Sequence, residues 1–284
     1  MSQEIRIDAL LPQEMATRAE YVGVRKAEAP ALTQFALSIM AGAFIALGAI
    51  FATTIWAGTA TDWPYGVSRL LGGLVFCLGL ILVVVGGAEL FTGNNLIVMA
   101  WASRKVSTRA LLRNWGIVYV GNFIGSFGMA VLVFLSKQYT AGGGAVGEMA
   151  LKIAVGKVNL GFVQALALGV LCNLLVCLAV WLTFSARSVV DKISAIIFPI
   201  AAFVAAGFEH SIANMYFVPF GLLIKAFDPG FVATAVEHGI ELSNLTWSAF
   251  LVKNLIPVTI GNIIGGALLV ASVYWSIYLR RKEK

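Results

Sequence analysis

A glutamate and a histidine stand side by side in an otherwise apolar stretch of this sequence. Glu209 and His210 follow an uncharged run over 196–208 and precede another over 215–224. Ionisable groups at membrane depth are costly, so they normally face a protein-lined or watery cavity and mark a pathway. Histidine titrates near neutral pH without help; a passing anion favours its protonated form and desolvation its neutral form. His210 is therefore a candidate counter-ion or proton donor for a weak-acid anion, with a satisfied structural histidine as the alternative.

The two neighbours are expected to differ in role. Adjacent residues on a helix point about 100° apart and so do not share one face. Glu209 has a counterpart in Glu89, which suggests an architectural task such as accepting exposed backbone N–H groups at a helix break. Leu90 occupies the place that corresponds to His210. The unpaired His210 is therefore the better candidate for the selective point of a transport protein.

Two signatures recur in the same order in both halves of the chain. If each signature occurred only once, it would indicate a helix kink or a close helix contact with a hydrogen-bonded asparagine. Repeated in register, they indicate an internal repeat of three spans. Because an odd number of spans reverses direction in the membrane, the halves are expected to be inverted copies, a plan that points to a site near the midplane. The matched segments are Gly87-x-Glu89 then Asn94 with Gly207-x-Glu209 then Asn214, and Gly121-Asn122-x-x-Gly125 with Gly261-Asn262-x-x-Gly265.

The composition indicates a membrane protein. Hydrophobic residues make up 60% of the 284 residues and charged residues 12%, whereas a soluble domain carries about 25% charged residues. We expect an all-α fold with six transmembrane elements of at least about 20 residues each. The second and fifth are interrupted, which is tolerated where the freed backbone lines a cavity or is buried in protein. The expected elements cover about 31–57, 66–104, 109–136, 158–185, 192–226 and 247–279.

The basic residues orient these elements. Fourteen of the 20 Lys and Arg fall on one side of the expected fold and six on the other. The positive-inside rule then places both termini in the cytoplasm. The net charge of +6 follows largely from this bias and is no evidence for nucleic-acid binding. The expected organisation is a cytoplasmic arm over 1–30, a channel domain over 31–279 with repeat halves at about 31–136 and 158–279, and a basic tail over 280–284.

The arm has the pattern of a short amphipathic helix. Pro12 suits a first helical position and Gly23 a stop. Leu11, Met15, Ala19 and Val22 fall on one face of such a helix. The helix either anchors the first span at the interface, which is the commoner role for such arms, or acts as a mobile plug beneath a pore.

The connections over 136–158 and 228–244 are expected to be outer loops. Lys157, at the end of the first of them, either snorkels at the interface or dips toward a pore mouth. Cys77, Cys172 and Cys177 lie in apolar spans without metal-ligand spacing. They are expected to be small packing residues, with no disulfide framework and no metal or cofactor.

A set of motifs resembles the formate/nitrite transporter family over essentially the whole chain. The resemblance implies an aquaporin-like protomer in a homopentamer of the bacterial inner membrane, with one pore in each protomer. It also implies passive, pH-sensitive passage of formate and similar small monovalent anions. The motifs are Glu89-Leu90-Phe91-Thr92, Gly121-Asn122, Cys172-Asn173-Leu174, 207–215 and 256–262.

The resemblance also implies roles for individual positions. The central pair would be His210 and Thr92. Apolar slits that gate by dewetting would be formed on the cytoplasmic side by Leu80, Leu90 and Ala213, and on the periplasmic side by Phe76, Phe91, Val176 and Phe203. Polar support would come from Lys157, Asn173 and Asn262, which favours an electrostatic role for Lys157. The gating role of the arm gains support in the same way.

Three function classes remain at this point. An anion channel fits the central histidine, and the substrate would pass either as the anion or, after taking a proton from His210, as the neutral acid. A neutral-solute pore of the aquaporin type is the alternative, although such pores usually offer asparagine pairs. An intramembrane enzyme using Glu209 and His210 is disfavoured, because the sequence offers neither a partnered nucleophile nor a metal-ligand cluster.

Overall fold

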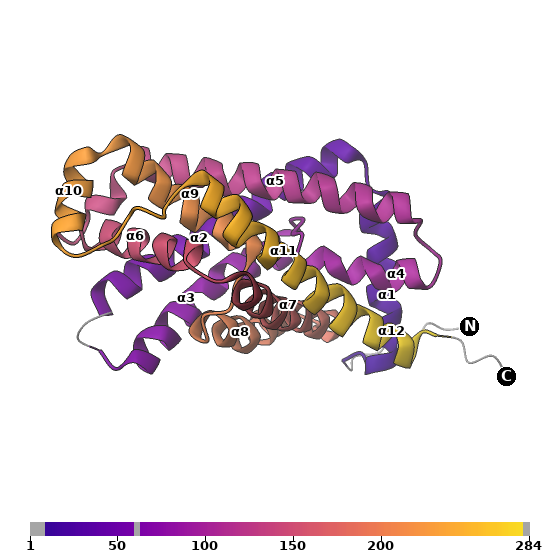
Figure 1. Ribbon diagram of the computed structural model, residues 1–284. Coiled ribbons are helices and arrows are strands. Elements are labelled where there is room, and N and C mark those ends of the chain that lie inside the picture. Colours follow the sequence, from indigo (N-terminus) through magenta and orange to yellow (C-terminus); the bar gives the residue numbers. More distant parts are fainter. Residues whose placement is uncertain (1–8, 60–62, 281–284) are drawn as a thin grey trace, which may run out of the picture.

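The computed structural model describes residues 9–59 and 63–280, and this part of the chain is helical, with no strand (Figure 1). Among these residues, five helices are long and apolar enough to cross a membrane. The number is six if α9 (Ser211–Phe227) and α10 (Pro229–Glu237), which meet at a bend of 106°, count as one span. The other spans are α2 (Ala31–Thr59), α3 (Tyr65–Gly86), α5 (Thr108–Leu135), α7 (Phe162–Ser185) and the composite helix Ala249–Tyr278. The all-helical membrane fold expected from the composition is confirmed.

The helices leave two distinct ends to the molecule. At one end lie α1 (Pro12–Glu28), α4 (Val98–Ala102) and α12 (Val273–Tyr278), and at the other lie α6 (Ala145–Val158) and α10 (Figure 1). Large apolar side chains cover much of the sides between them; Phe198, for example, is 81% exposed. Such a surface suits contact with lipid or with other apolar protein surfaces.

The two halves of the chain repeat the same packing. In the first half α2 packs on α3 and α5; in the second, α7 packs on α8 (Val189–Ala205) and α11 (Ile256–Ile263). A Cβ at Gly125 would overlap the carbonyl oxygen of Ile39, and one at Gly265 would overlap that of Val170. The outer glycines of the Gly-Asn-x-x-Gly signatures thus bring equivalent helix pairs into backbone contact.

The two interrupted elements break in the same way. Gly87 follows α3 at φ 78° and Gly207 follows α8 at φ 76°, a left-handed conformation that favours glycine. The Ala88 N–H donates to the Val83 carbonyl at 2.9 Å, and the Phe208 N–H to the Phe203 carbonyl at 3.0 Å. The Gly207 N–H also donates to the Val204 carbonyl, which completes the helix-ending Schellman arrangement at the second break, whereas the Gly87 N–H donates to the Val83 carbonyl at the first. The chain then restarts as the 3₁₀ turn η1 (Gly93–Ile97) followed by α4 in the first half, and as α9 in the second.

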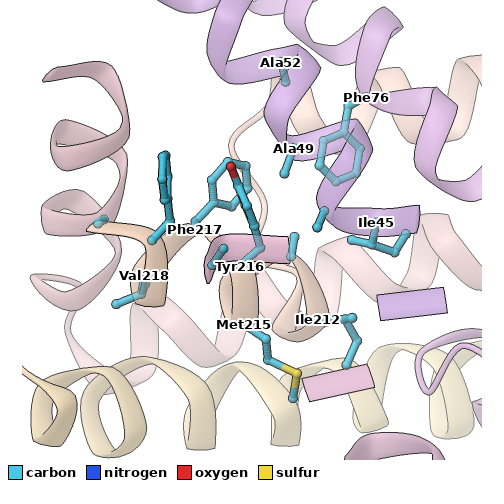
Figure 2. Close-up of a cluster of buried hydrophobic side chains, with 14 of the residues drawn as sticks. Ile45, Ala49, Ala52, Phe76, Ile212, Met215, Tyr216, Phe217 and Val218 are labelled. Atoms are coloured by element: carbon cyan, nitrogen blue, oxygen red, sulfur yellow. The ribbon is translucent and has the colours of Figure 1, made fainter. Parts of the chain in front are cut away.

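α9 is the centre of the hydrophobic core. Every residue from 209 to 222 is buried, as expected for a helix surrounded by protein on all sides. Ile212, Tyr216 and Phe217 belong to the same buried cluster as side chains of α2 and α3 such as Ile45 and Phe76 (Figure 2). The helix restart in the second half is therefore held rigidly.

The last element is a single 30-residue helix, Ala249–Tyr278. It contains two π-helical segments, η3 (Ala249–Leu255) and η4 (Ile264–Ser272), on either side of α11. π-helical turns are rare and often occur at functional sites. Here Asn254 comes from the first of them and Asn262 from α11, and both reach the break between α8 and α9.

Several local expectations are wrong. The connection over 136–158 contains η2 (Gln138–Thr140) and α6, and that over 228–244 contains α10, so neither is a simple loop.

The arm helix α1 begins at Pro12 as expected, but it continues through Gly23 to Glu28. A Cβ at Gly23 would lie 3.1 Å from the Ala100 Cβ, so this glycine serves close packing on α4. Leu11 is 67% exposed, unlike Met15 and Ala19. Segments 1–8 of the arm and 281–284 of the basic tail lie outside the described residues.

Candidate functional site

A polar cluster surrounds Glu209 at the second break. Its Oε1 accepts a hydrogen bond from Lys157 Nζ at 2.7 Å, and its Oε2 accepts from Asn214 Nδ2 at 2.7 Å and Asn254 Nδ2 at 3.0 Å. Asn254 Nδ2 also donates to the Lys157 carbonyl at 3.0 Å, and Asn214 Nδ2 to Asn254 Oδ1 at 2.7 Å. A buried carboxylate held by a cation and two amides is well compensated for its lost hydration.

The first break carries the same cluster around Glu89. Lys26 Nζ lies 3.1 Å from Glu89 Oε1, and Asn94 Nδ2 donates to Glu89 Oε2 at 2.7 Å. Asn94 Nδ2 also donates to Asn114 Oδ1 at 3.0 Å, and Asn114 Nδ2 to the Lys26 carbonyl at 3.1 Å. The counterpart of Lys157 is therefore Lys26, which the arm helix α1 supplies.

The glutamates bind side chains, so the expectation that they accept backbone N–H groups is wrong. Asparagines perform that task. Asn122 Oδ1 accepts from the Phe91 N–H and Asn262 Oδ1 from the Ser211 N–H, both at 2.9 Å. The same two amides donate to the carbonyls of Glu89 and Glu209, at 2.9 and 3.0 Å respectively.

Asn173 also supports the breaks. Its Nδ2 donates to the Asn262 carbonyl at 2.7 Å and to the Thr92 carbonyl at 3.3 Å. Both Asn173 and Asn262 are fully buried. The two amides thus hold backbone on either side of the point where the two breaks meet.

His210 and Thr92 meet at the centre of the molecule. His210 Nε2 lies 3.0 Å from Thr92 Oγ1, and the Ala213 N–H donates to His210 Nδ1 at 3.1 Å, which caps α9. Because Nδ1 accepts, the proton of the neutral ring lies on Nε2 and is donated to Thr92. The Thr92 hydroxyl hydrogen is then available to another acceptor. The Phe203 ring stacks on the imidazole, with centroids 5.9 Å apart.

Three cavities lie in sequence through this centre. The α1-side cavity has a volume of about 240 Å³ and the α6-side cavity about 270 Å³. A central cavity of about 10 Å³ lies between them. It shares Leu80 and Leu90 with the α1-side cavity, and Phe76, Phe203 and His210 with the α6-side cavity. About 10–15 Å³ holds one water molecule, so the centre is a narrow apolar constriction between two larger chambers.

The three other expected constriction residues lie in three different places. Val176 lines the central cavity. Ala213 lines the α6-side cavity, whereas Leu80 and Leu90, with which it was expected to form one slit, line the α1-side and central cavities. Phe91 lines none of the three cavities; its ring packs on Tyr119 and Trp115, with centroids 4.9 and 5.9 Å away. Its backbone N–H is held by Asn122.

Both large cavities have an excess of positive charge. Among the described residues, three cations and one carboxylate line each of them, and such an excess concentrates anions in a low-dielectric cleft. The same part of the chain holds no group of three His, Cys, Asp or Glu side chains that could bind a metal ion. The charged residues are Arg18, Lys26, Lys192 and Glu89 on the α1 side, and Arg69, Lys152, Lys157 and Glu209 on the α6 side.

Sequence reasoning missed four of these groups. Asn114 and Asn254 carry a usable signal, because each lies eight residues before the asparagine of a Gly-Asn-x-x-Gly signature. Lys26 carries no such signal, since its distance along the chain from Glu89 differs from that between Lys157 and Glu209. Arg69 lies in the first turns of α3, where a basic residue is ordinary for the edge of a span.

Known proteins resemble this chain over most of its length. The family model for formate/nitrite transporters matches residues 13–276. The formate channel FocA of Escherichia coli strain K12 is 47% identical over 227 residues, which cover 80% of this chain and 79% of that protein. FocA of Haemophilus influenzae is 40% identical over 226 residues, with 80% and 79% covered.

Two solved structures resemble it as well. A pentameric formate channel with formate bound has 48% sequence identity and a TM-score of 0.82, with 88% of this chain and 98% of that chain covered. An ion channel of the same family has 26% identity and a TM-score of 0.75, with 94% and 98% covered.

Proposed function

The chain belongs to the formate/nitrite transporter family, and from that premise we propose that it is a passive, pH-sensitive channel for formate and related small monovalent anions. The observation that carries the proposal is the line of three cavities, with positively biased chambers at both ends and His210 at the constriction. Thr92 lines none of the three cavities and is tied to them through its hydrogen bond to His210. Similarity to proteins described as formate channels supplies the substrate class.

Passage would proceed in three stages. The anion enters a chamber where the excess of lysine and arginine favours it over cations. It then loses water between the rings and aliphatic side chains of Phe76, Phe203, Leu80 and Leu90. At that point the Thr92 hydroxyl, whose oxygen accepts the His210 Nε2–H, would donate a hydrogen bond to the carboxylate and offset part of its lost hydration.

The capping bond to His210 bears on the choice between anion and neutral acid. The neutral imidazole holds a single proton, on Nε2, and giving it to formate would leave an anionic ring. Proton transfer to formate therefore requires a doubly protonated imidazole. Protonation of Nδ1 would require release of the Ala213 N–H that it accepts. In the conformation seen here the geometry therefore favours passage of the hydrogen-bonded anion, and passage as formic acid would require α9 to lose its cap.

The assembly and orientation follow from the same premise. The chain would form a homopentamer in the bacterial inner membrane, with the pore inside each protomer; the pentameric relative and the apolar sides of the helices support this. The basic bias would place the α1 end in the cytoplasm. Arg18, Val22 and Lys26 of α1 line the α1-side cavity, which supports a gating role for the arm.

Formate flux under an imposed membrane potential tests the proposal. The purified chain is reconstituted in liposomes, and formate uptake is followed at two potentials of opposite sign and at two pH values. An anion channel gives rates that change with the potential and with pH. Rates indifferent to both would contradict an anion channel and favour the neutral-solute pore. Absence of any formate uptake would contradict the substrate class.

A further inference from the structure

The α6-side cavity has three cations, and two of them are already paired. Lys157 Nζ lies 2.7 Å from Glu209 Oε1, and Lys152 Nζ lies 3.8 Å from Glu148 Oε2. Arg69 also lines this cavity, and among the residues that the structure describes no carboxylate pairs with it. The unbalanced positive charge of the chamber is therefore centred on Arg69.

The guanidinium of Arg69 is fixed in place. Its Nε donates to the Ala205 carbonyl at 3.1 Å and its Nη2 to the Val204 carbonyl at 2.6 Å, at the end of α8. Its Cζ lies 4.7 Å from the centroid of the Trp56 ring. Two bonds leave three of the five guanidinium N–H groups for a ligand. The group is therefore ordered in advance, which lowers the cost of binding.

Arg69 also lies in line with the constriction. Arg69, Phe76 and Leu80 are spaced at seven and four residues along α3, so they share one face of that helix. Seven residues correspond to roughly 10 Å of helix at 1.5 Å per residue. An anion held at Arg69 would thus stand about two helical turns outside the Phe76 ring, on the same side of the same cavity.

We propose that Arg69 is a capture site for the carboxylate of the permeating anion, occupied before the anion reaches Lys157 and the constriction. A planar guanidinium binds a carboxylate with two parallel hydrogen bonds, which an ammonium group does not. The proposal rests on the proposed function, since it concerns entry of the same substrate. It adds a specificity-determining residue that selects small planar carboxylates at the α6-side entrance.

A purely structural role for Arg69 gives different expectations. The two bonds to the last carbonyls of α8 could simply hold the break before Gly207. Loss of that clamp would lower the rate equally at every formate concentration and ionic strength. Loss of a capture charge would act at low formate concentration, and salt would mask it, because the Debye length falls from about 30 Å at 0.01 M to about 3 Å at 1 M.

The experiment compares formate entry from the α6 side in proteoliposomes containing wild type, Arg69→Gln, Arg69→Lys and Lys137→Asn. Lys137 is a cation at the same end that lines none of the three cavities, and asparagine suits its left-handed conformation at φ 56°. At low ionic strength and low formate, Arg69→Gln should reduce the entry rate about tenfold, the lower end of electrostatic focusing. The saturating rate should be unchanged, and the deficit should vanish near 1 M salt.

Arg69→Lys and Lys137→Asn complete the test. Compared with Arg69→Gln, the Arg69→Lys variant should restore much of the entry rate for compact anions such as chloride and less of the entry rate for formate. Lysine keeps the positive charge but lacks the two parallel N–H groups of the guanidinium. The control should match wild type. Two results would overturn capture by Arg69. One is an equal entry rate for Arg69→Gln and wild type. The other is a lower rate in both Arg69 variants that does not change with salt or with formate concentration. A wild type that carries no formate would instead contradict the proposed function itself.

Discussion

The two helix breaks of this protein are built from the same parts, and two of the differences between them concern groups that line the cavities. Each has a lysine, a glutamate and two asparagines in one hydrogen-bonded cluster, and an asparagine that holds the backbone. The first difference is the source of the lysine: Lys26 comes from the arm helix and Lys157 from α6. The second is the residue after the glutamate, which is Leu90 in one break and His210 in the other.

These differences separate scaffold from function. The shared groups make the break itself stable, because every one of them binds backbone or the other cluster members. The groups that differ line the cavities together with the two glutamates, so they are the candidates for the functional difference between the two sides. Lys26 has a side chain that is 30% exposed and Lys157 one that is 14% exposed, so the α1-side cluster is the more open of the two.

The largest expected effect comes from removing one lysine. Lys157→Met leaves the buried Glu209 carboxylate without its cation and should cost about 3–5 kcal/mol of stability. Lys26→Met should cost only about 1 kcal/mol, since water reaches the more exposed pair. Thermal unfolding of the detergent-solubilised variants measures both. A loss in Lys26→Met equal to that in Lys157→Met would show that the arm cluster is as closed as its counterpart.

Removal of a backbone-holding asparagine should have a smaller effect, equal in the two halves. Asn122→Ala and Asn262→Ala each strip hydrogen bonds from two carbonyls and one N–H, all buried. We expect about 3 kcal/mol for each, the lower end of the range for three unsatisfied groups at about 1–3 kcal/mol apiece. The same unfolding measurement applies. Tolerance of one substitution and not the other would break the equivalence of the two halves.

Glycine substitutions test the repeated helix contacts. Gly125→Ala and Gly265→Ala push a methyl group into the carbonyls of Ile39 and Val170, and overpacking of this kind costs about 1–3 kcal/mol. Gly128→Ala is the control on α5, because a Cβ there meets open space. The unfolding midpoint should fall in the first two variants and stay or rise in the third. An unchanged midpoint in Gly125→Ala or Gly265→Ala would contradict the close contact at that helix pair.

The smallest expected effect concerns the α6 end outside the spans. The Tyr139 hydroxyl donates to Asp228 Oδ2 at 2.6 Å, and burial together with this acceptor raises the pKa of Tyr139 to about 12 from 10.0. A raised pKa means that folding favours the neutral phenol, so its contribution is complete below pH 10 and is lost as the pH rises through about 12. Tyr139→Phe should remove this part of the alkaline destabilisation, measured as the unfolding midpoint between pH 9 and 12. An identical alkaline profile in the variant would exclude the phenol as its source.

The repeat could be predicted from the sequence because identical residue types recur at identical spacing. Glu89 with Glu209 and Asn94 with Asn214 are visible in this way, and so are the membrane spans, which follow from composition and length. The pairing of Lys26 with Lys157 could not be predicted, since the two lysines reach equivalent places from segments with unequal connections. Only the folded arm brings Lys26 to Glu89.

The directions of individual side chains could not be predicted from the sequence either. Phe91 and Phe203 are both aromatic residues near a break, yet only Phe203 lines the cavities. The Phe91 ring packs on Tyr119, a residue 28 positions away on α5, and that tertiary contact is not visible in the sequence. The task of Glu209 was misjudged for a similar reason: asparagines and the imidazole of His210 already satisfy the freed N–H groups.

The central claim is that His210, the residue without a counterpart, gives the channel its pH-dependent selectivity, because protonation of its Nδ1 would break the cap of α9. The most direct test is formate flux into liposomes at pH 7.5 and 5.5 for wild type, His210→Ala and His238→Ala. His238 is the control, because it is the other histidine of the chain and binds Glu148 at the α6 end. We predict that wild type and His238→Ala change their flux with pH and that His210→Ala does not. The same pH dependence in all three would show that His210 is structural and that selectivity arises from the constriction and the charged chambers.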